Sequence, residues 1–217
     1  MISNELYKRV FTSLVLLPIL IICIFFNKYV FLVFLIFIGI VSSYEWYLMN
    51  KKKNLLTFFL GFSFLLISII SSFILRGNDN ESIFFFTWIL FVCFFSDIGG
   101  YIFGKIIGGK RWLKISPNKT VGGTIGSIIF SFCPILIINY QTFFVTSLKI
   151  NINTLVLTLI VSLICQLGDI IISYFKRLRN LKDTGNILPG HGGFLDRIDG
   201  IIFVLPAVLF IKFFNLI

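Results

Sequence analysis

Residues 55–75, LLTFFLGFSFLLISIISSFIL, form an apolar run without a charged side chain. A helix needs about 20 such residues to cross the roughly 30 Å hydrocarbon core of a bilayer, whereas strands of a membrane barrel alternate over about ten residues. The chain of 217 residues is 58% hydrophobic and only 13% charged, which is more apolar than a soluble domain. The sequence therefore predicts an all-α, polytopic integral membrane protein.

Seven apolar runs follow one another along the chain, at residues 10–26, 29–49, 55–75, 83–104, 121–140, 154–175 and 200–214. They predict about seven transmembrane helices in a single integral membrane domain that covers residues 1–217. The first run lacks a small-residue cleavage site, which favours a retained helix over a signal peptide. The four cysteines lie inside the runs without paired spacing, so neither a disulfide nor a cysteine metal site is expected.

The basic residues are distributed unevenly over the predicted loops. If the N-terminus is cytoplasmic, all but four of the 19 Lys and Arg residues lie on the cytoplasmic side, the exceptions being Lys28, Arg76, Lys149 and Lys212. Positively charged short loops stay in the cytoplasm, so this distribution predicts an N-in, C-out membrane protein. The net charge of +10 is then concentrated on the cytoplasmic face, where it would attract anionic lipids and soluble polyanions.

Three carboxylates, Glu45, Asp97 and Asp169, lie inside predicted spans. Each costs about 2.5 to 3.5 kcal/mol in hydrocarbon, so each requires a partner, a cation or a water-filled cavity. All three are expected roughly 5 to 10 Å inside the cytoplasmic ends of their helices. They predict one polar layer beside the basic loops, although each could instead be a separate structural residue, above all Glu45 in the aromatic segment SYEWY.

The segment PGHGGFLDRID, residues 189–199, is the most polar interruption of the apolar pattern. Asp196 and Asp199 stand three residues apart, which on a helix places them side by side. Two carboxylates so close favour a divalent cation between them, or a pair of metals as in phosphoryl-transfer enzymes. The alternative is that they simply complement the dipole at a helix start.

The same segment contains the only histidine of the chain, flanked by glycines. Gly190, Gly192 and Gly193 allow a tight turn whose N–H groups could cradle phosphate oxygens. His191 cannot build a zinc site without further histidine or cysteine ligands. We expect it to contact phosphate or substrate, the alternative being a hydrogen-bonded structural histidine.

Two further groups of polar residues adjoin the predicted cytoplasmic ends. Helical spacing places Asp169 and Ser173 on the same face as Lys176 and Arg177, a carboxylate below two cations. The segment before the run at 121–140 contains a proline and a lysine between two hydroxyl side chains. This composition is typical of a helix start that binds an anion, and the alternative is an ordinary N-cap. The residues of this second group are Ser116, Lys119 and Thr120.

The segment SYFKRLRNLKDTGNILPGHGGFLDRID, residues 173–199, resembles the signature of the phosphatidate cytidylyltransferases, with S-x-x-K-R, K-D, P-G-H-G-G and D-R-x-D all present. The stretches SDIGGYIFGKIIGG at 96–109 and ISPNKT at 115–120 are similar to a second block of that family. Gly122 and Ile172 stand where the family commonly has acidic residues. Together the similar segments cover about a third of the chain.

The resemblance implies transfer of the cytidylyl group of CTP to phosphatidic acid, which leaves CDP-diacylglycerol in the membrane and releases pyrophosphate. It implies Mg²⁺ as the cofactor and leaves open whether a second, monovalent cation is bound. Membrane lipids, but no nucleic acid, are the expected partners. A homodimer is a further expectation. The active site would face the cytoplasmic side of a bacterial inner membrane, so that CTP enters from water while the diacyl tails stay in lipid.

On this hypothesis the three aspartates Asp169, Asp196 and Asp199 hold magnesium, and Asp97 is a further candidate ligand. The phosphates are assigned to Lys176, Arg177, Lys182, Arg197 and His191. The nucleotide or lipid headgroup is assigned to Ser116, Lys119 and Thr120, and the remaining substrate-binding candidates are Ser173, Asp183, Gly190, Gly192 and Gly193.

Two alternatives remain open at this point. A CDP-alcohol phosphotransferase is also a small helical membrane enzyme with paired aspartates, but its longer aspartate-rich run is not found here. An anion transporter would likewise use charges inside the membrane and helix ends. The chain, however, lacks inverted halves, and its polar residues gather on one side rather than at the midplane.

Overall fold

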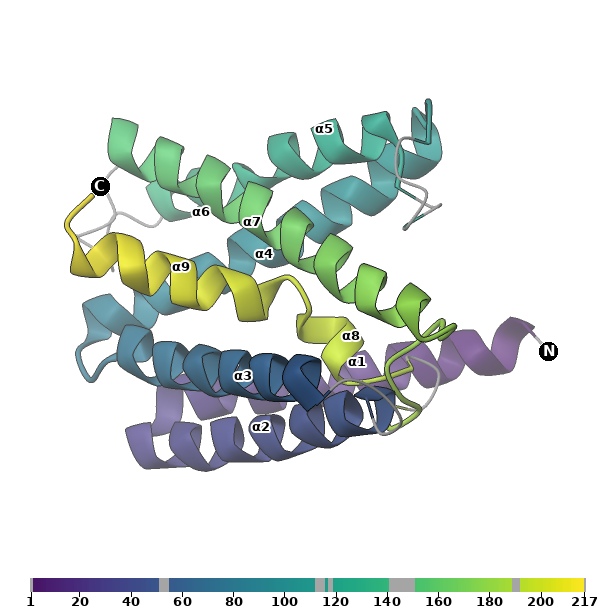
Figure 1. Ribbon diagram of the computed structural model, residues 1–217. Coiled ribbons are helices and arrows are strands. Elements are labelled where there is room, and N and C mark those ends of the chain that lie inside the picture. The colour runs from purple at the N-terminus through teal and green to yellow at the C-terminus, as the bar shows by residue number, and fades with distance from the viewer. Residues whose placement is uncertain are drawn as a thin grey trace.

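The computed structural model describes residues 2–50, 55–111, 116, 119–140, 151–188 and 192–216 (Figure 1). Within these ranges the fold is all-helical, which confirms the predicted class, and the bridges at Arg111 and Leu188 are isolated. The helices are α1 (Ile2–Phe26), α2 (Lys28–Asn50), α3 (Leu55–Arg76), α4 (Asn80–Ile106), α5 (Val121–Ser131), α6 (Cys133–Tyr140), α7 (Ile152–Leu178), α8 (Leu195–Ile198) and α9 (Ile201–Phe213).

Four of the described helices, α2, α3, α4 and α7, are long and apolar enough to cross a membrane. Shorter apolar helices cover residues 14–26, 121–136 and 201–213, where the sequence predicts the other three spans. The run at 121–140 is divided because α5 ends at Ser131 and α6 begins at Cys133. The chain is thus a multi-pass membrane protein by composition and helix length, with four rather than seven full-length candidate spans in the described residues.

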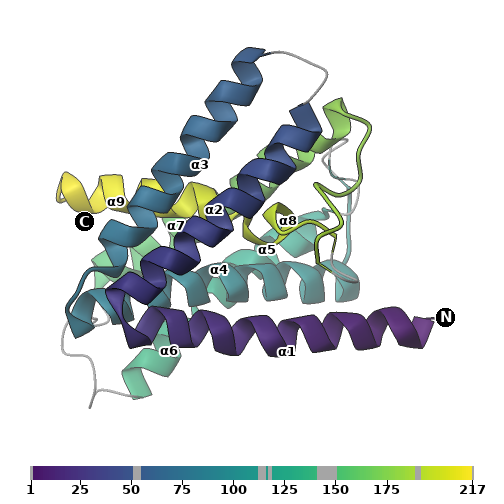
Figure 2. The same ribbon diagram turned by 90° about the horizontal axis from the view of Figure 1, so that it is seen from below.

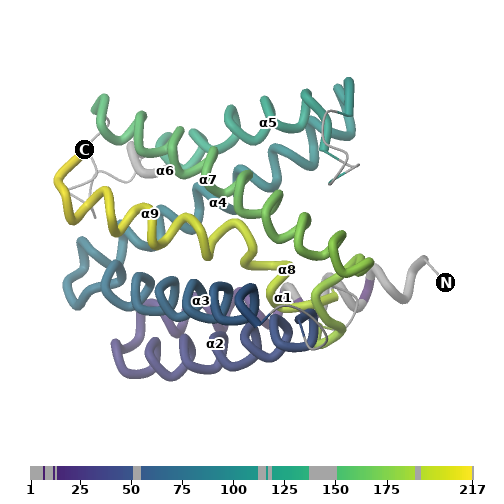
Figure 3. The backbone as a smooth tube through the Cα atoms, in the orientation of Figure 1, coloured from purple at the N-terminus to yellow at the C-terminus, as the bar shows by residue number. Residues whose placement is uncertain are grey.

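The longer helices run between two ends of the bundle, and the two termini lie at opposite ends (Figure 3). Helices α2 and α3 pack side by side, and α3 also contacts α9. Seen from below, α1 and α2 meet at one end and diverge from there (Figure 2). The end that holds the N-terminus also holds the C-terminal end of α7, the segment 179–188 and α8. The described site residues gather at this end.

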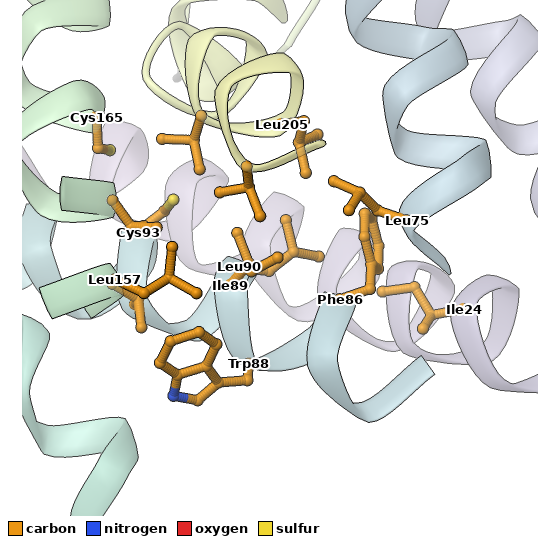
Figure 4. Close-up of a cluster of buried hydrophobic side chains, with 14 of the residues drawn as sticks. Ile24, Leu75, Phe86, Trp88, Ile89, Leu90, Cys93, Leu157, Cys165 and Leu205 are labelled. Atoms are coloured by element: carbon orange, nitrogen blue, oxygen red, sulfur yellow. The ribbon is translucent and has the colours of Figure 1, made fainter. Parts of the chain in front are cut away.

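The core lies mainly between α4, α7 and α9 (Figure 4). Trp88 and Cys93 of α4 face Leu157 of α7 there, and all three are buried. A second, smaller cluster contains Trp46 of α2, Ile172 of α7 and Leu195 of α8. This cluster links the helices that carry the site, so their ends are held by packing rather than by the loops alone.

Helices α4 and α5 cross at a stripe of glycines. A Cβ added to Gly126 would lie 2.7 Å from the carbonyl oxygen of Gly99 and would also collide with Phe103. A Cβ added to Gly104 would make only ordinary contacts, 3.5 Å from the hydroxyl of Thr120. Small residues let two helix backbones approach closely inside a membrane. The crossing therefore fixes the start of α5, and with it Lys119, against α4.

Replacing Gly126 by Ala should destabilise the protein, whereas Gly104→Ala should not. The added methyl at Gly126 meets a backbone oxygen that cannot move aside, and such overpacking costs about 1–3 kcal/mol. At Gly104 the gain in helix propensity, up to about 1 kcal/mol, meets no clash. Thermal unfolding of both variants in detergent tests this expectation. Equal midpoints for the two variants would show that the crossing is not tightly packed.

Candidate active site

Asp169 of α7 pairs with a lysine that precedes α5. Lys119 Nζ lies 2.6 Å from Asp169 Oδ2 and also donates to the carbonyl oxygen of Gln166 at 3.0 Å. Ser173 donates to the other oxygen of Asp169 at 3.4 Å, so the predicted common face of α7 exists. The Asp169 side chain is 37% exposed and that of Lys119 is 19% exposed. The pair is therefore accessible from one side.

The segment that precedes α5 caps the helix by a hydrogen bond to its backbone. Thr120 is the N-cap of α5, and its hydroxyl accepts a hydrogen bond from Gly123 N at 3.1 Å. This is the N-cap geometry that the sequence left as an alternative to anion binding. Lys119 is directed to Asp169, and Ser116 is partly buried nearby in the sequence. Of the three residues assigned to substrate here, Lys119 is the one brought to the aspartates.

Asp196 forms a second ion pair, which is more deeply buried. Lys176 Nζ lies 2.6 Å from Asp196 Oδ1, and the two side chains are 10% and 7% exposed. Asp196 Oδ2 accepts from Thr184 N at 2.8 Å and Gly193 N at 3.2 Å, and the Thr184 hydroxyl oxygen lies 3.1 Å away. A buried carboxylate needs such partners, because an unpaired charge is very costly to bury. Asp196 therefore ties the loop before α8 to α7.

Asp97 of α4 and Asp199, which precedes α9, form a separate group with Asp169. Burial raises the pKa of the Asp199 carboxyl well above its usual range, and the charges of Asp169 and Asp97 raise it further. Asp199 accepts only a local hydrogen bond from Gly200 N at 3.0 Å in the described chain, and Asp97 accepts from the Cys165 thiol at 3.9 Å. Three carboxylates from three segments thus share one region.

No three acidic, histidine or cysteine side chains among the described residues converge closely enough to enclose a metal ion. Asp97, Asp196 and Asp199 line one cavity, and the charges of Asp169 and Asp97 act on Asp199. Their oxygen atoms are the ligands that Mg²⁺ prefers, and Asp97 and Asp199 have few competing hydrogen-bond donors. The donor set therefore suits a magnesium ion bound together with phosphate oxygens.

A cavity of about 410 Å³ opens beside these residues. Its walls are apolar side chains of α1, α2, α3, α4 and α9, among them Leu20, Phe31 and Leu205. One group of lining residues is charged: Asp97, Asp196, Arg197 and Asp199. A molecule that fits this cavity must be apolar over most of its length and charged at one place.

Most of the sequence is similar to one family of known proteins. The profile of the Cytidylyltransferase family matches residues 50–214. The chain belongs to this family. A phosphatidate cytidylyltransferase of Rickettsia bellii is 34% identical over 97% of this chain and 92% of its own length. The family match favours cytidylyl transfer over the CDP-alcohol phosphotransferase and transporter alternatives.

Staphylococcal relatives of the family are more similar over a shorter stretch. Phosphatidate cytidylyltransferases of Staphylococcus haemolyticus and Staphylococcus aureus are 42% and 43% identical over 61% and 59% of this chain. The aligned regions cover 50% and 49% of those proteins, so the chain spans about half the length of these curated relatives. The resemblance of the segments at 96–120 and 173–199 to this family is thus confirmed.

The glycine-rich loop of this cytidylyltransferase-family protein is described in part. His191 and Gly190 lie outside the described residues. Gly192 has a φ of +83°, a left-handed conformation that favours glycine, and its carbonyl oxygen accepts from Leu188 N at 3.0 Å. The N–H of Gly193 donates to Asp196, so it supports the aspartate rather than pointing at a ligand.

The remaining predicted phosphate ligands lie around the loop. Arg177 donates to the carbonyl oxygen of Leu181 at 3.0 Å and thereby closes the end of α7. Lys182 and Asp183 are exposed, and Arg197 is an exposed residue of α8 that lines the cavity. Sequence reasoning missed Thr184, which contacts both Asp196 and Glu45. A single threonine in a loop carries no pattern that would have revealed it.

Proposed function

We propose that this protein transfers the cytidylyl group of CTP to phosphatidic acid, giving CDP-diacylglycerol and pyrophosphate. The observation that carries the proposal is the largely apolar cavity whose charged part contains three carboxylates, one of them paired with Lys176, and one arginine. An amphipathic lipid substrate fits that combination, since tails and headgroup need opposite surroundings. The relatives from Rickettsia bellii and Staphylococcus haemolyticus are phosphatidate cytidylyltransferases, which supports the same reaction.

The reaction needs positioning and charge more than a strong base. The phosphate monoester of phosphatidic acid has a second pKa of about 6, so it is largely ionised at neutral pH. One of its oxygens attacks the α-phosphorus of CTP, a new P–O bond forms, and the bond to the β-phosphate oxygen breaks with release of pyrophosphate. Lys119, Lys176 and Arg197 supply positive charge near the cavity, which favours the approach of two anions and the departure of a third.

Asp97, Asp169 and Asp199 are the residues that we propose would hold Mg²⁺. Asp196 stays a predicted further ligand, and to bind the ion it would have to exchange the contact of its Oδ1 atom with Lys176. Magnesium, when bound, would neutralise phosphate charge and polarise the P–O bonds. The monovalent cation and the homodimer stay predictions. Lys119 orients Asp169, and Gly200 N orients Asp199.

We also propose that the site faces the cytoplasm of a bacterial inner membrane. The N-terminus, the segment 179–188 and α8 lie at the same end of the bundle, and the described segments at this end include the basic residues Lys176, Arg177, Arg179, Lys182 and Arg197. An excess of basic residues marks the cytoplasmic side. The tails of phosphatidic acid and other membrane lipids would approach between the helices, and CTP from water.

Incubating the purified protein with labelled CTP and phosphatidic acid, with and without Mg²⁺, tests this function. We expect lipid-soluble label and pyrophosphate to appear in equal amounts, only when both substrates and magnesium are present. Diacylglycerol without its phosphate serves as the control lipid and should yield no product. The absence of labelled lipid under all conditions, from protein that remains folded in detergent, would contradict the proposal.

A further inference from the structure

Glu45 of α2 is a fully buried carboxylate at 0% exposure, and it faces the loop that precedes α8. Its Oε1 accepts from Phe194 N at 2.8 Å. Its Oε2 accepts from Leu195 N at 2.8 Å and from the Thr184 hydroxyl at 2.9 Å. The two ion pairs of the described chain use Asp169 and Asp196, so Glu45 is balanced by hydrogen bonds rather than by a cation.

The loop is shaped around this carboxylate. A Cβ added to Gly185 would lie 2.7 Å from Glu45 Oε1, and one added to Gly193 would lie 2.8 Å from Oε2. Both backbone positions therefore approach Glu45 more closely than any side chain would allow. The family profile begins at residue 50, so Glu45 lies before the matched segment. The contact joins helix α2 to the part of the chain that carries the charged groups.

Thr184 extends the contact to Asp196. Its hydroxyl oxygen lies 2.9 Å from Glu45 Oε2 and 3.1 Å from Asp196 Oδ2, but a hydroxyl has only one hydrogen to donate. Asp196 Oδ2 already accepts from Thr184 N and Gly193 N, whereas Glu45 Oε2 has one other donor. The Thr184 hydroxyl therefore donates its hydrogen to Glu45 Oε2 rather than to Asp196. Thr184 is thus held by Glu45 through its side chain and by Asp196 through its amide.

We infer that Glu45 is a positioning residue, which acts through Thr184 and the amides of Phe194 and Leu195. It holds the loop so that Asp196 keeps Lys176 in place beside the cavity. An amide cannot replace the carboxylate, because each oxygen of Glu45 accepts a backbone N–H. Whichever oxygen becomes an NH₂ group, one buried N–H loses its acceptor. The inference rests on the proposed function only for its activity readout.

The test compares Glu45→Gln with Glu81→Gln, an exposed glutamate in the first turn of α4 at the opposite end of the bundle. The first readout is cytidylyl transfer, for which we expect kcat to fall about 100-fold in Glu45→Gln, as a displaced catalytic group does, and to stay unchanged in Glu81→Gln. The second is tryptic cleavage after the exposed Lys182 relative to Lys105, which should become about tenfold faster in Glu45→Gln as the loop opens more often.

Substitutions at Thr184 give an independent test if Glu45→Gln does not fold. Thr184→Ser keeps the hydroxyl and should stay within about twofold of the wild-type kcat, whereas Thr184→Val should lose about tenfold, the value of one hydrogen bond. The double variant Glu45→Gln/Thr184→Val should be no slower than Glu45→Gln alone, because both changes break the same contact.

Three results would overturn the inference: wild-type kcat and cleavage in Glu45→Gln, loss of activity without faster cleavage after Lys182, or equal kcat in the Thr184 variants. An inactive wild-type protein would instead contradict the proposed function. The cleavage rates would then still decide whether Glu45 holds the loop.

Discussion

Asp199→Asn should lower CTP- and phosphatidate-dependent pyrophosphate release about 1,000-fold. Asp199 lines the cavity together with Asp97 and interacts electrostatically with Asp97 and Asp169. An asparagine of the same shape keeps one oxygen but removes the negative charge, and with it the attraction for a divalent cation. Losing a group that stabilises charge in the transition state typically costs about 100- to 1,000-fold in kcat. The measurement is pyrophosphate release at saturating substrates over a range of Mg²⁺ concentrations.

Asp79→Asn is the matched control for this substitution. Asp79 caps α4 at the opposite end of the bundle, where its Oδ2 accepts from Ser82 N at 2.8 Å. Asparagine caps helices as well as aspartate does, so activity should not change. Retention of wild-type turnover by Asp199→Asn would remove this residue from the proposed magnesium site. A loss that is reversed by raising Mg²⁺ would support the site directly.

Lys176→Met should both destabilise the protein and abolish its activity. The substitution leaves Asp196 buried without its cation, and breaking one side of a buried pair costs about 3–5 kcal/mol. Methionine has a similar volume, so the loss comes from charge rather than from a cavity. Thermal unfolding in detergent should show a clear fall in the midpoint, whereas Lys105→Met, at an exposed position of α4, should not.

A double substitution separates stability from catalysis at this pair. Lys176→Met/Asp196→Leu removes both charges, and apolar replacement of a buried pair is often neutral for stability. The midpoint should recover at least in part, while pyrophosphate release stays absent because the charged end of the cavity is lost. Recovery of activity in the double variant would show that the pair serves folding alone.

The fold was predictable because hydrophobic runs respond to a single strong constraint, the thickness of the bilayer. The run at 55–75 became α3 with nearly the same ends, and the run at 83–104 lies within α4. The break between Ser131 and Cys133 was not predicted, because a turn that stays apolar leaves hydropathy unchanged. Length and polarity thus locate helices well but do not reveal where one of them is interrupted.

Spacing predicted the site only within single segments. The shared face of Asp169 and Ser173 was evident from the helical period, and the structure has it. The partners of the two lysines could not be predicted in this way. Lys119 precedes α5 whereas Asp169 lies on α7, and Lys176 of α7 reaches across to Asp196 of α8. A pattern in one segment says which residues can meet there, but contacts between segments depend on how the helices pack.

The glycine crossing of α4 and α5 has a mechanical consequence for the carboxylates. With no side chain between Gly99 and Gly126, the two helices form one stiff unit that carries Asp97 and Lys119, while α7 carries Asp169. Asp97 and Asp169 therefore lie on opposite sides of the interface between the α4–α5 unit and α7. If α7 slides along the α4–α5 unit, even by a fraction of a helical turn, the distance between Asp97 and Asp169 changes and the contact between Lys119 and Asp169 breaks.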